Sequence, residues 1–111
     1  DTHPKAIAGF KNDTVKILEP DAIIRIFTAN QKVYAETEYG EYLLRLRLYE
    51  LEERLNKNIF TRISNSEIIN LKKVINMDLS FSGTICVNLH GGTTTYVSRR
   101  YVSRIKKILG I

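Results

Sequence analysis

Alternation of apolar and polar side chains, broken by glycine-containing turns, is the feature that most limits how this chain can fold. Between Thr84 and Leu89, Ile85 and Val87 face the same way as Leu89, and a second extended stretch runs from Thr93 to Val97. Successive side chains of a strand point to opposite faces, so this period of two predicts β-strands. His90-Gly91-Gly92 lies between the stretches and supplies the positive φ angles of a tight turn. The sequence therefore predicts a β-hairpin here.

The same pattern recurs along most of the chain. Asn12-Asp13, Pro20-Asp21 and Tyr39-Gly40 are turn signals, and stretches typical of strands stand beside each of them. The expected strands are Ala6 to Phe10, Thr14 to Leu18, Ala22 to Thr28, Val33 to Thr37 and Tyr42 to Leu46, with two more inside Phe60 to Asn70. The chain is predicted to be mostly β.

Only two stretches have helical spacing. Leu48, Leu51 and Leu55 fall at i, i+3 and i+7, which predicts a short helix that caps a sheet. Its acidic residues would repel a polyanion, and they are Glu50, Glu52 and Glu53. The second stretch is a basic amphipathic turn at the end of the chain. Its apolar face holds Val102, Ile105 and Leu109, and its basic face holds Arg100, Arg104 and Lys107.

The length of 111 residues limits the chain to one domain, residues 1–111. The sequence does not begin with Met, so we expect it to be part of a longer protein. The single cysteine, Cys86, has no intramolecular disulfide partner, and no apolar run could cross a bilayer or serve as a signal peptide. We therefore expect a cytoplasmic location and no membrane partner.

Charge is unevenly distributed between the two halves of the sequence. Residues 1–53 carry 7 basic and 10 acidic side chains, a net charge of −3, whereas residues 54–111 carry 10 basic and 2 acidic, a net charge of +8. Such a basic half is typical of a surface that attracts polyanions, although basic helices are often merely solvated.

Two polar segments could read nucleic-acid bases. Ser64-Asn65-Ser66 is a polar kink between two strands, and Arg99-Arg100 follows the strand that ends at Val97. Asn can pair with the edge of an adenine and Arg with the edge of a guanine, so the two segments together supply base-reading chemistry. This combination indicates a DNA-binding protein.

The ordered series of motifs resembles the LytTR DNA-binding domain of bacterial transcription regulators, over nearly the whole chain. The series comprises the strand pair Ile23 to Phe27 and Lys32 to Thr37, the helix Leu48 to Leu55, Phe60, Arg62-Ile63-Ser64, Ser66, Ile68-Ile69-Asn70, Gly91-Gly92 and Val97 to Tyr101. The resemblance implies about ten short strands in small stacked antiparallel sheets, with one capping helix and a C-terminal helical turn. It also implies loops that enter two successive major grooves of promoter direct repeats, with two domains per site and a possible homodimer.

The resemblance assigns roles to individual residues. The expected base-reading residues are Asn65, Arg100 and Gln31. The residues expected to contact phosphate or to support the loops are Lys32, Arg62, Ser64, Ser66, Arg99, Ser103, Arg104 and Lys107. We expect Asn65 and Arg100 to read positions about one helical turn, roughly 10 base pairs, apart.

Each assignment has a structural alternative. Asn65 could satisfy its own turn, Arg62 could brace the loop rather than contact phosphate, and Asn30-Gln31-Lys32 could be an ordinary hairpin turn. Arg99 is as basic as Arg100, and the sequence does not separate them. Ser64 and Ser66 are better suited to capping backbone groups or touching phosphate than to reading bases.

Enzymatic signatures are missing from the sequence. His3 and His90 have no partners at metal-ligand spacing, and there is no phosphate-binding glycine loop or nucleophile motif. We expect no enzyme activity, no cofactor and no metal, with Cys86 a half-buried strand residue. The alternative function is an RNA-binding or protein-interaction β module with a basic edge, which we rank second because the tyrosines alternate with strand-core positions.

Overall fold

Residues with positive φ angles mark where the strands reverse. The structure is a computed structural model that describes residues 6–111. Asn30 and Gln31 have φ angles of 51° and 65°, and they alone connect Ala29 to its partner Lys32. Two consecutive positive values in a two-residue loop are those of a type I′ hairpin turn, whose twist matches that of the strands. Gly91 and Gly92, with φ angles of 87° and 84°, lie in the predicted turn, between the strand residues Leu89 and Thr94.

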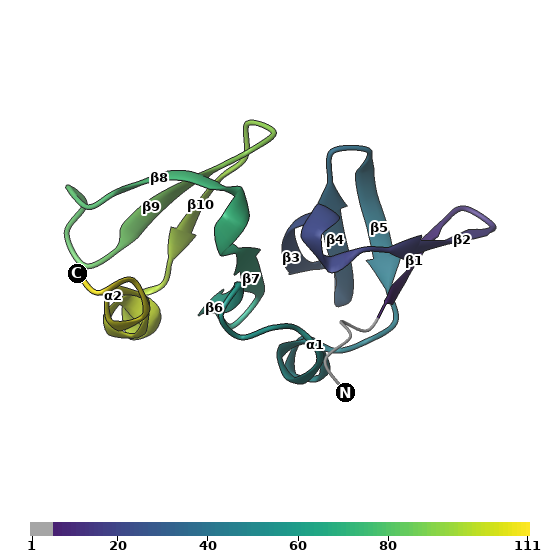
Figure 1. The fold of residues 1–111 in the computed structure, drawn as a ribbon, viewed down its shortest axis with the longest axis horizontal. Coiled ribbons are helices and arrows are strands. Elements are labelled where there is room, and N and C mark those ends of the chain that lie inside the picture. Colours follow the sequence, from purple (N-terminus) through teal and green to yellow (C-terminus); the bar gives the residue numbers. More distant parts are fainter. Residues whose placement is uncertain (1–5) are drawn as a thin grey trace.

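Residues 6–111 form ten strands in two antiparallel sheets (Figure 1). The strands are β1 (Ile7–Lys11), β2 (Thr14–Leu18), β3 (Ile23–Ala29), β4 (Lys32–Thr37), β5 (Gly40–Leu44), β6 (Phe60–Ser64), β7 (Glu67–Asn70), β8 (Val74–Asp78), β9 (Ile85–Leu89) and β10 (Thr94–Val97). The first sheet has the strand order β2-β1-β5-β4-β3-β7-β6, and the second has the order β10-β9-β8. Figure 1 shows β6 and β7 between the second sheet and the rest of the first sheet.

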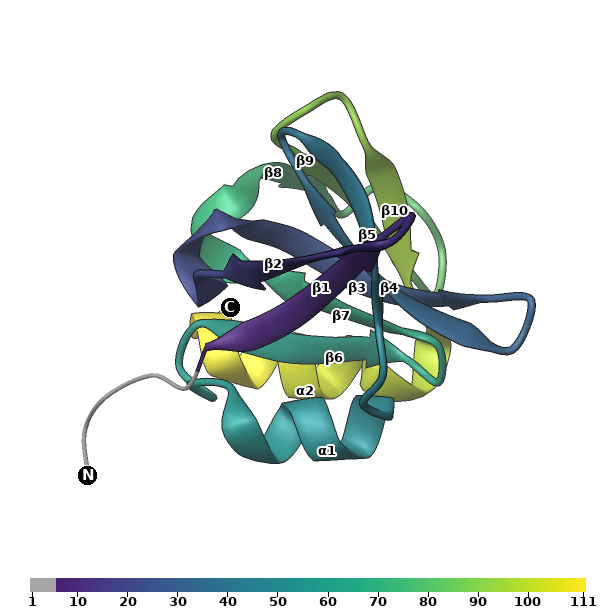
Figure 2. The same cartoon turned by 90° about the vertical axis from the view of Figure 1, so that its right-hand side faces the viewer.

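Two α-helices cover the lower side of the molecule in Figure 2. They are α1 (Leu48–Arg54) and α2 (Val102–Leu109), and three short 3₁₀ turns are η1 (Pro20–Ala22), η2 (Leu71–Lys73) and η3 (Arg99–Tyr101). The backbone amide of Arg47 donates to the Glu50 carboxylate over 2.9 Å, which begins α1. At the end of α2, Gly110 adopts a φ of 72°, and the amide of Ile111 donates to the carbonyl of Lys106.

The molecule has two hydrophobic cores. The first lies between the first sheet and α1, and it buries all three leucines predicted to face the sheet, which are Leu48, Leu51 and Leu55. The second lies between β6 and β7, the second sheet and α2, and it includes Ile63, Val87 and Ile105, each 0% exposed. Because β6 and β7 contribute to both cores, they hold the two halves together.

The fold confirms the predicted mostly β architecture, with adjustments at the element ends. Ala22 belongs to η1 rather than to β3, and β5 ends at Leu44, two residues before the predicted end. The C-terminal helical turn is longer than predicted, because it continues through eight residues as α2. Cys86 is buried, at 7% exposure, where the sequence predicted a half-buried residue. Strand β8 lies in a stretch for which no strand was predicted from the sequence.

A charged network links the two sheets. Arg25 of β3 donates to Glu36 of β4 over 2.7 Å and to Glu67 of β7 over 3.0 Å. The hairpin of β9 and β10 adds two hydroxyls, because Thr93 in its turn donates to Glu36 over 2.5 Å and Thr95 of β10 donates to Glu67 over 2.7 Å. Burial alone would lower the pKa of Arg25, but the hydrogen bonds to Glu36 and Glu67 raise the pKa overall, so the guanidinium stays charged.

We expect Arg25→Ala to lower the free energy of unfolding by about 3 to 5 kcal/mol, because it leaves two largely buried carboxylates without their cation. The side chains of Glu36 and Glu67 are 14% and 11% exposed. Chemical denaturation measures the change, with Arg54→Ala on the exposed side of α1 as the control. A loss for Arg25→Ala no larger than that of the control would show that the network does not hold the sheets together.

Candidate nucleic-acid interface

Three turns that are distant in the sequence meet at one edge of the molecule. The carbonyl of Ser66, in the β6–β7 turn, accepts from the amide of Thr28 near the end of β3, over 2.9 Å. On the other side, the amide of Ser98 donates to the carbonyl of Ile63 of β6 over 2.8 Å. The β3–β4 turn, the β6–β7 turn and the start of α2 therefore lie side by side in that order, along the right-hand side of Figure 2.

The β6–β7 turn presents an exposed asparagine. The two serines beside Asn65 are occupied with each other, since the amide of Ser66 donates to the Ser64 hydroxyl over 3.1 Å and their hydroxyls lie 3.3 Å apart. Within residues 6–111, the Asn65 side chain has no hydrogen bond to the backbone of its own turn, and its one polar contact is the Tyr101 hydroxyl at 3.5 Å. Its amide group therefore remains available to a partner.

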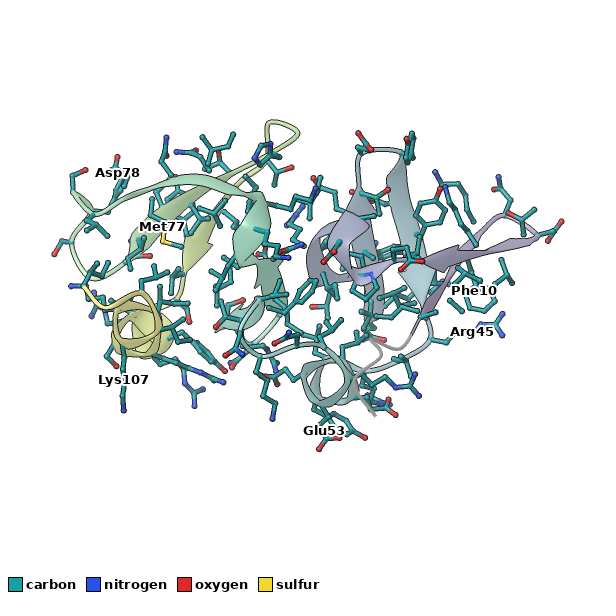
Figure 3. All side chains as sticks on the ribbon, in the orientation of Figure 1. Phe10, Arg45, Glu53, Met77, Asp78 and Lys107 are labelled. Carbon is teal, nitrogen blue, oxygen red and sulfur yellow. The ribbon has the colours of Figure 1, made fainter. Side chains whose placement is uncertain are left out.

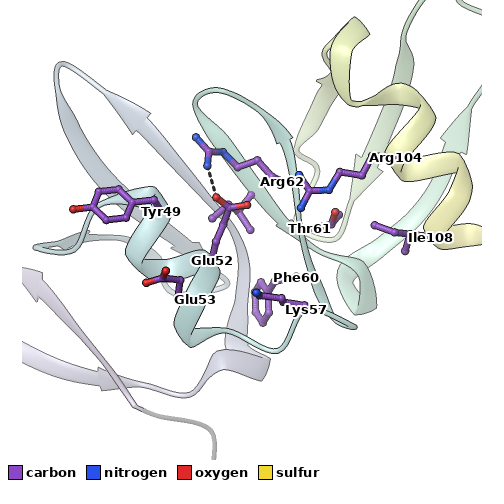
Figure 4. Close-up of a pocket in the computed structure, with 10 residues that line it drawn as sticks. Tyr49, Glu52, Glu53, Lys57, Phe60, Thr61, Arg62, Arg104 and Ile108 are labelled. Atoms are coloured by element: carbon purple, nitrogen blue, oxygen red, sulfur yellow. Dashed lines mark hydrogen bonds and ion pairs between the residues drawn. The ribbon is translucent and has the colours of Figure 1, made fainter.

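Arg62 braces this turn from below. Its guanidinium donates to the carbonyl of Ser64 over 2.8 Å and to the carbonyl of Asn65 over 2.7 Å, and it forms an ion pair of 2.6 Å with Glu52 of α1 (Figure 4). All three contacts use different nitrogens of the planar guanidinium, which a lysine could not reproduce. The contacts correspond to the bracing alternative for Arg62. They also show that Glu52 holds this arginine instead of lying free on the surface.

Arg99 and Arg100 differ in their surroundings, although the sequence could not separate them. The Arg99 guanidinium lies against Gly83, with one nitrogen 2.9 Å from where a Cβ would stand, so it is directed toward the second sheet. Arg100 lies 5.8 Å from the ring centre of Tyr101, whose hydroxyl contacts Asn65. The structure therefore groups Arg100, rather than Arg99, with the asparagine turn.

The β3–β4 turn stands on the other side of Asn65. Gln31 is exposed at its tip, and Lys32 is exposed at the first position of β4. The turn is the two-residue hairpin that the sequence offered as the structural alternative, but its backbone geometry leaves both side chains in solvent. A type I′ hairpin with exposed polar side chains is compatible both with an ordinary turn and with a turn whose Gln31 and Lys32 contact DNA.

The phosphate-binding candidates on α2 divide into two groups. Ser103 and Arg104 lie in the first turn of the helix, at the same edge as Asn65 and Arg100, and both are exposed. Lys107 lies farther along the helix and extends away beneath it in Figure 3. The edge thus brings together all the predicted residues except Lys107 and the guanidinium of Arg99.

A pocket of about 300 Å³ opens between the two helices, next to Arg62 and Arg104 (Figure 4). Its walls mix Glu52, Glu53 and Lys57 with apolar side chains. Residues 6–111 hold no group of three potential metal ligands, and none of their helices is long and apolar enough to span a membrane. His3, one of the two histidines considered above, lies outside the described residues.

Sequence reasoning missed the Arg62–Glu52 ion pair and the Tyr101–Asn65 contact. The sequence also predicted that Asn65 and Arg100 read positions about one helical turn of DNA apart; in the structure, Tyr101, which follows Arg100, contacts Asn65. The position of Tyr101 directly after Arg99 and Arg100 was the only local signal in the sequence for these contacts. Each contact joins the β6–β7 hairpin to a helical segment, α1 for Glu52 and η3 for Tyr101, which periodicity in the sequence does not report.

Comparison with known proteins gives one consistent answer. The family model of the LytTr DNA-binding domain matches residues 13–110. Uncharacterized HTH-type transcriptional regulators of Staphylococcus aureus strains NCTC 8325 and COL are 36% identical over 105 residues, which cover 95% of this chain and 71% of each relative. A solved LytTr DNA-binding domain from Bacillus cereus has the same fold, with a TM-score of 0.92, 22% identity and coverage of 96% of this chain and 97% of that one.

The name of the relatives mentions a helix-turn-helix, and the described residues contain none. Helix α1 ends at Arg54 and α2 begins at Val102, with five strands between them. The edge described above is therefore built from turns and the start of one helix.

We expect Arg62→Lys to loosen the β6–β7 turn without changing net charge, because one amine cannot replace three directed contacts. Amide hydrogen exchange should become faster at Asn65 and Ser66 while the thermal midpoint falls by a few degrees at most. Arg54→Lys is the matched control, because Arg54 is exposed and its side chain has no hydrogen-bond or ion-pair partner within residues 6–111. Unchanged exchange in Arg62→Lys would contradict the bracing role.

Proposed function

The chain belongs to the LytTR family of DNA-binding domains, and on that premise we propose that it binds duplex DNA sequence-specifically as part of a bacterial transcription regulator. One observation supports this most strongly. A single edge of the molecule carries the exposed side chains of Gln31, Asn65 and Arg100, in that order, on turns fixed to one another by backbone hydrogen bonds. Amide and guanidinium groups of this kind pair with base edges.

The order of the turns determines how a duplex would lie against them. In the first sheet, three strand spacings of about 4.8 Å separate β4 from β6, and the segment that begins at Ser98 lies about one spacing farther on. The backbones that carry Gln31 and Arg100 therefore stand about 20 Å apart, before the length of their side chains is added. Successive major grooves are about 34 Å apart, a distance that bending of the duplex reduces on the concave side. Gln31 and Arg100 are therefore the pair suited to successive major grooves, and Asn65 faces the duplex between them.

Phosphate contacts flank these base-reading positions. Lys32 lies beside the Gln31 tip, and Ser103 and Arg104 lie in the first turn of α2, where their exposed side chains can donate to an anion. Ser64 and Ser66 cap each other and present hydroxyls on the same edge. Arg62 acts by holding the Asn65 turn, while Arg99 and Lys107 contribute charge near the duplex without a directed contact.

The proposal includes promoter direct repeats, with one domain on each repeat and two domains per site. This stoichiometry follows from the family resemblance, and analytical ultracentrifugation of the domain on one-repeat and two-repeat duplexes measures it. A homodimer in the absence of DNA is a separate outcome of the same experiment.

One exposed aromatic pair favours a second candidate, single-stranded nucleic-acid binding. Phe81, in the loop between β8 and β9, and Tyr96 of β10 are 45% and 51% exposed, and their rings meet edge to face with centres 5.9 Å apart. Exposed aromatic rings are the stacking platforms of single-strand binders, and the sequence had placed the tyrosines in the core pattern. Competition between duplex and single-stranded DNA or RNA of one sequence separates the two functions.

The test of specificity is a matrix of variants against base-pair substitutions in a site selected from random duplexes, at fixed salt. Gln31→Ala, Asn65→Ala and Arg100→Ala should each lose about 1 to 3 kcal/mol of discrimination at a different position. The positions affected by Gln31 and Arg100 should lie farthest apart, with that of Asn65 between them. Asn58→Ala, an exposed asparagine between α1 and β6, should change nothing.

Two results would contradict this assignment. If all three variants weaken every sequence equally, the turns contact only the backbone of the duplex. If the Asn65 position lies outside the interval between the other two, the duplex does not follow the order of the turns.

A further inference from the structure

Arg45, which belongs to the acidic half of the sequence, lies at the same edge of the molecule as Gln31. Val33 of β4 is paired with Leu44, the last residue of β5, so the next residue, Arg45, comes opposite Lys32. Directly opposed residues of antiparallel strands have side chains on the same face. Leu44 is buried and Val33 packs against the same core, so Lys32 and Arg45 point to the other, solvent-facing side.

Arg45 is held in place but its charge is not neutralised. Its guanidinium carbon lies 4.0 Å from the ring centre of Phe10 of β1, and Figure 3 shows the two side chains next to each other. Within residues 6–111, no carboxylate lies within 4.0 Å of it. A guanidinium stacked on an aromatic ring keeps its in-plane N–H groups free for another acceptor.

The position of Arg45 suits the rim of a groove rather than its floor. Arg45 is level with Lys32, while the tip formed by Asn30 and Gln31 projects beyond both. The major groove is about 8.5 Å deep, so a hairpin tip that reaches its floor leaves the residues behind it at the level of the phosphates.

We propose that Arg45, together with Lys32, binds the phosphodiester backbone of duplex DNA beyond the base read by Gln31, on the side away from Arg100. This inference rests on the proposed function and extends its contact surface by one strand, from β4 to β5. A strand spacing of about 4.8 Å corresponds to one or two base pairs along the duplex. The net charge of −3 of residues 1–53 conceals this contribution, because it sums charges along the sequence rather than over one face of the fold.

The test measures the dependence of the affinity on salt concentration. Loss of one phosphate contact reduces the magnitude of the negative slope of log K against log salt by about 0.9, so Arg45→Ala should show a shallower slope for all duplex sequences. Arg45→Lys should keep the slope, and Arg45→Gln should repeat the effect of Arg45→Ala if alanine disturbs the fold.

Lys16→Ala is the matched control, because it also removes a cation that stacks on aromatic rings. Its amine lies 4.9 Å from the ring centre of Tyr39, in the β4–β5 turn at the opposite end of β5 from Arg45. Lys16→Ala should leave the slope unchanged.

Duplexes shortened from one end locate the contact. Removing base pairs from the end beyond the Gln31 position should lower the affinity of the parent protein to that of Arg45→Ala, and should affect Arg45→Ala little. Removing base pairs from the Arg100 end should weaken both proteins alike.

The outcomes separate this inference from the proposed function. A steep slope for the parent protein with no change in Arg45→Ala, or an equal change in Lys16→Ala, overturns the Arg45 contact and leaves duplex binding intact. A slope near zero for the parent protein overturns duplex binding itself.

Discussion

The network centred on Arg25 is the interaction on which the arrangement of the molecule depends. Glu36 and Glu67 each use one oxygen for Arg25 of the first sheet and the other for a threonine of the β9–β10 hairpin. Every partner is needed, because a carboxylate left without its cation or hydroxyl would stay largely buried and unpaired. The apolar cores on either side fix the distance between the sheets, while the directed hydrogen bonds fix their relative position.

That relative position determines the spacing of the proposed contacts. Gln31 belongs to the first sheet, Arg100 follows the last strand of the second, and Asn65 stands on the strand pair between them. Arg62 fixes the position of the Asn65 turn in the same way, since its guanidinium holds two carbonyls of that turn and a carboxylate of α1. A duplex would thus meet three turns whose order and separation are set before binding, which lowers the entropic cost of association.

Local patterns in the sequence were sufficient to predict the hairpins and α1. Asn30, Gly91 and Gly92 are residue types that favour the positive φ angles they adopt, and Leu48, Leu51 and Leu55 are buried as their spacing predicts. The pairing of Arg62 with Glu52 and the alignment of Arg45 with Lys32 were not predictable, because both depend on which strands and helices become neighbours. Arg45 was not recognised as a candidate contact for the same reason. It belongs to residues 1–53, whose net charge is negative, but the charge of a sequence segment does not report the charge of a surface.

The most direct measurement is a map of backbone amide chemical shifts of the domain during titration with its selected duplex, at constant salt. The account predicts shifts concentrated at Asn30 to Lys32, at Ser64 to Ser66 and from Ser98 to Arg104, with little change on β2 and β8. Shifts concentrated instead around Phe81 and Tyr96 would contradict it, because neither residue belongs to the three segments predicted to meet the duplex.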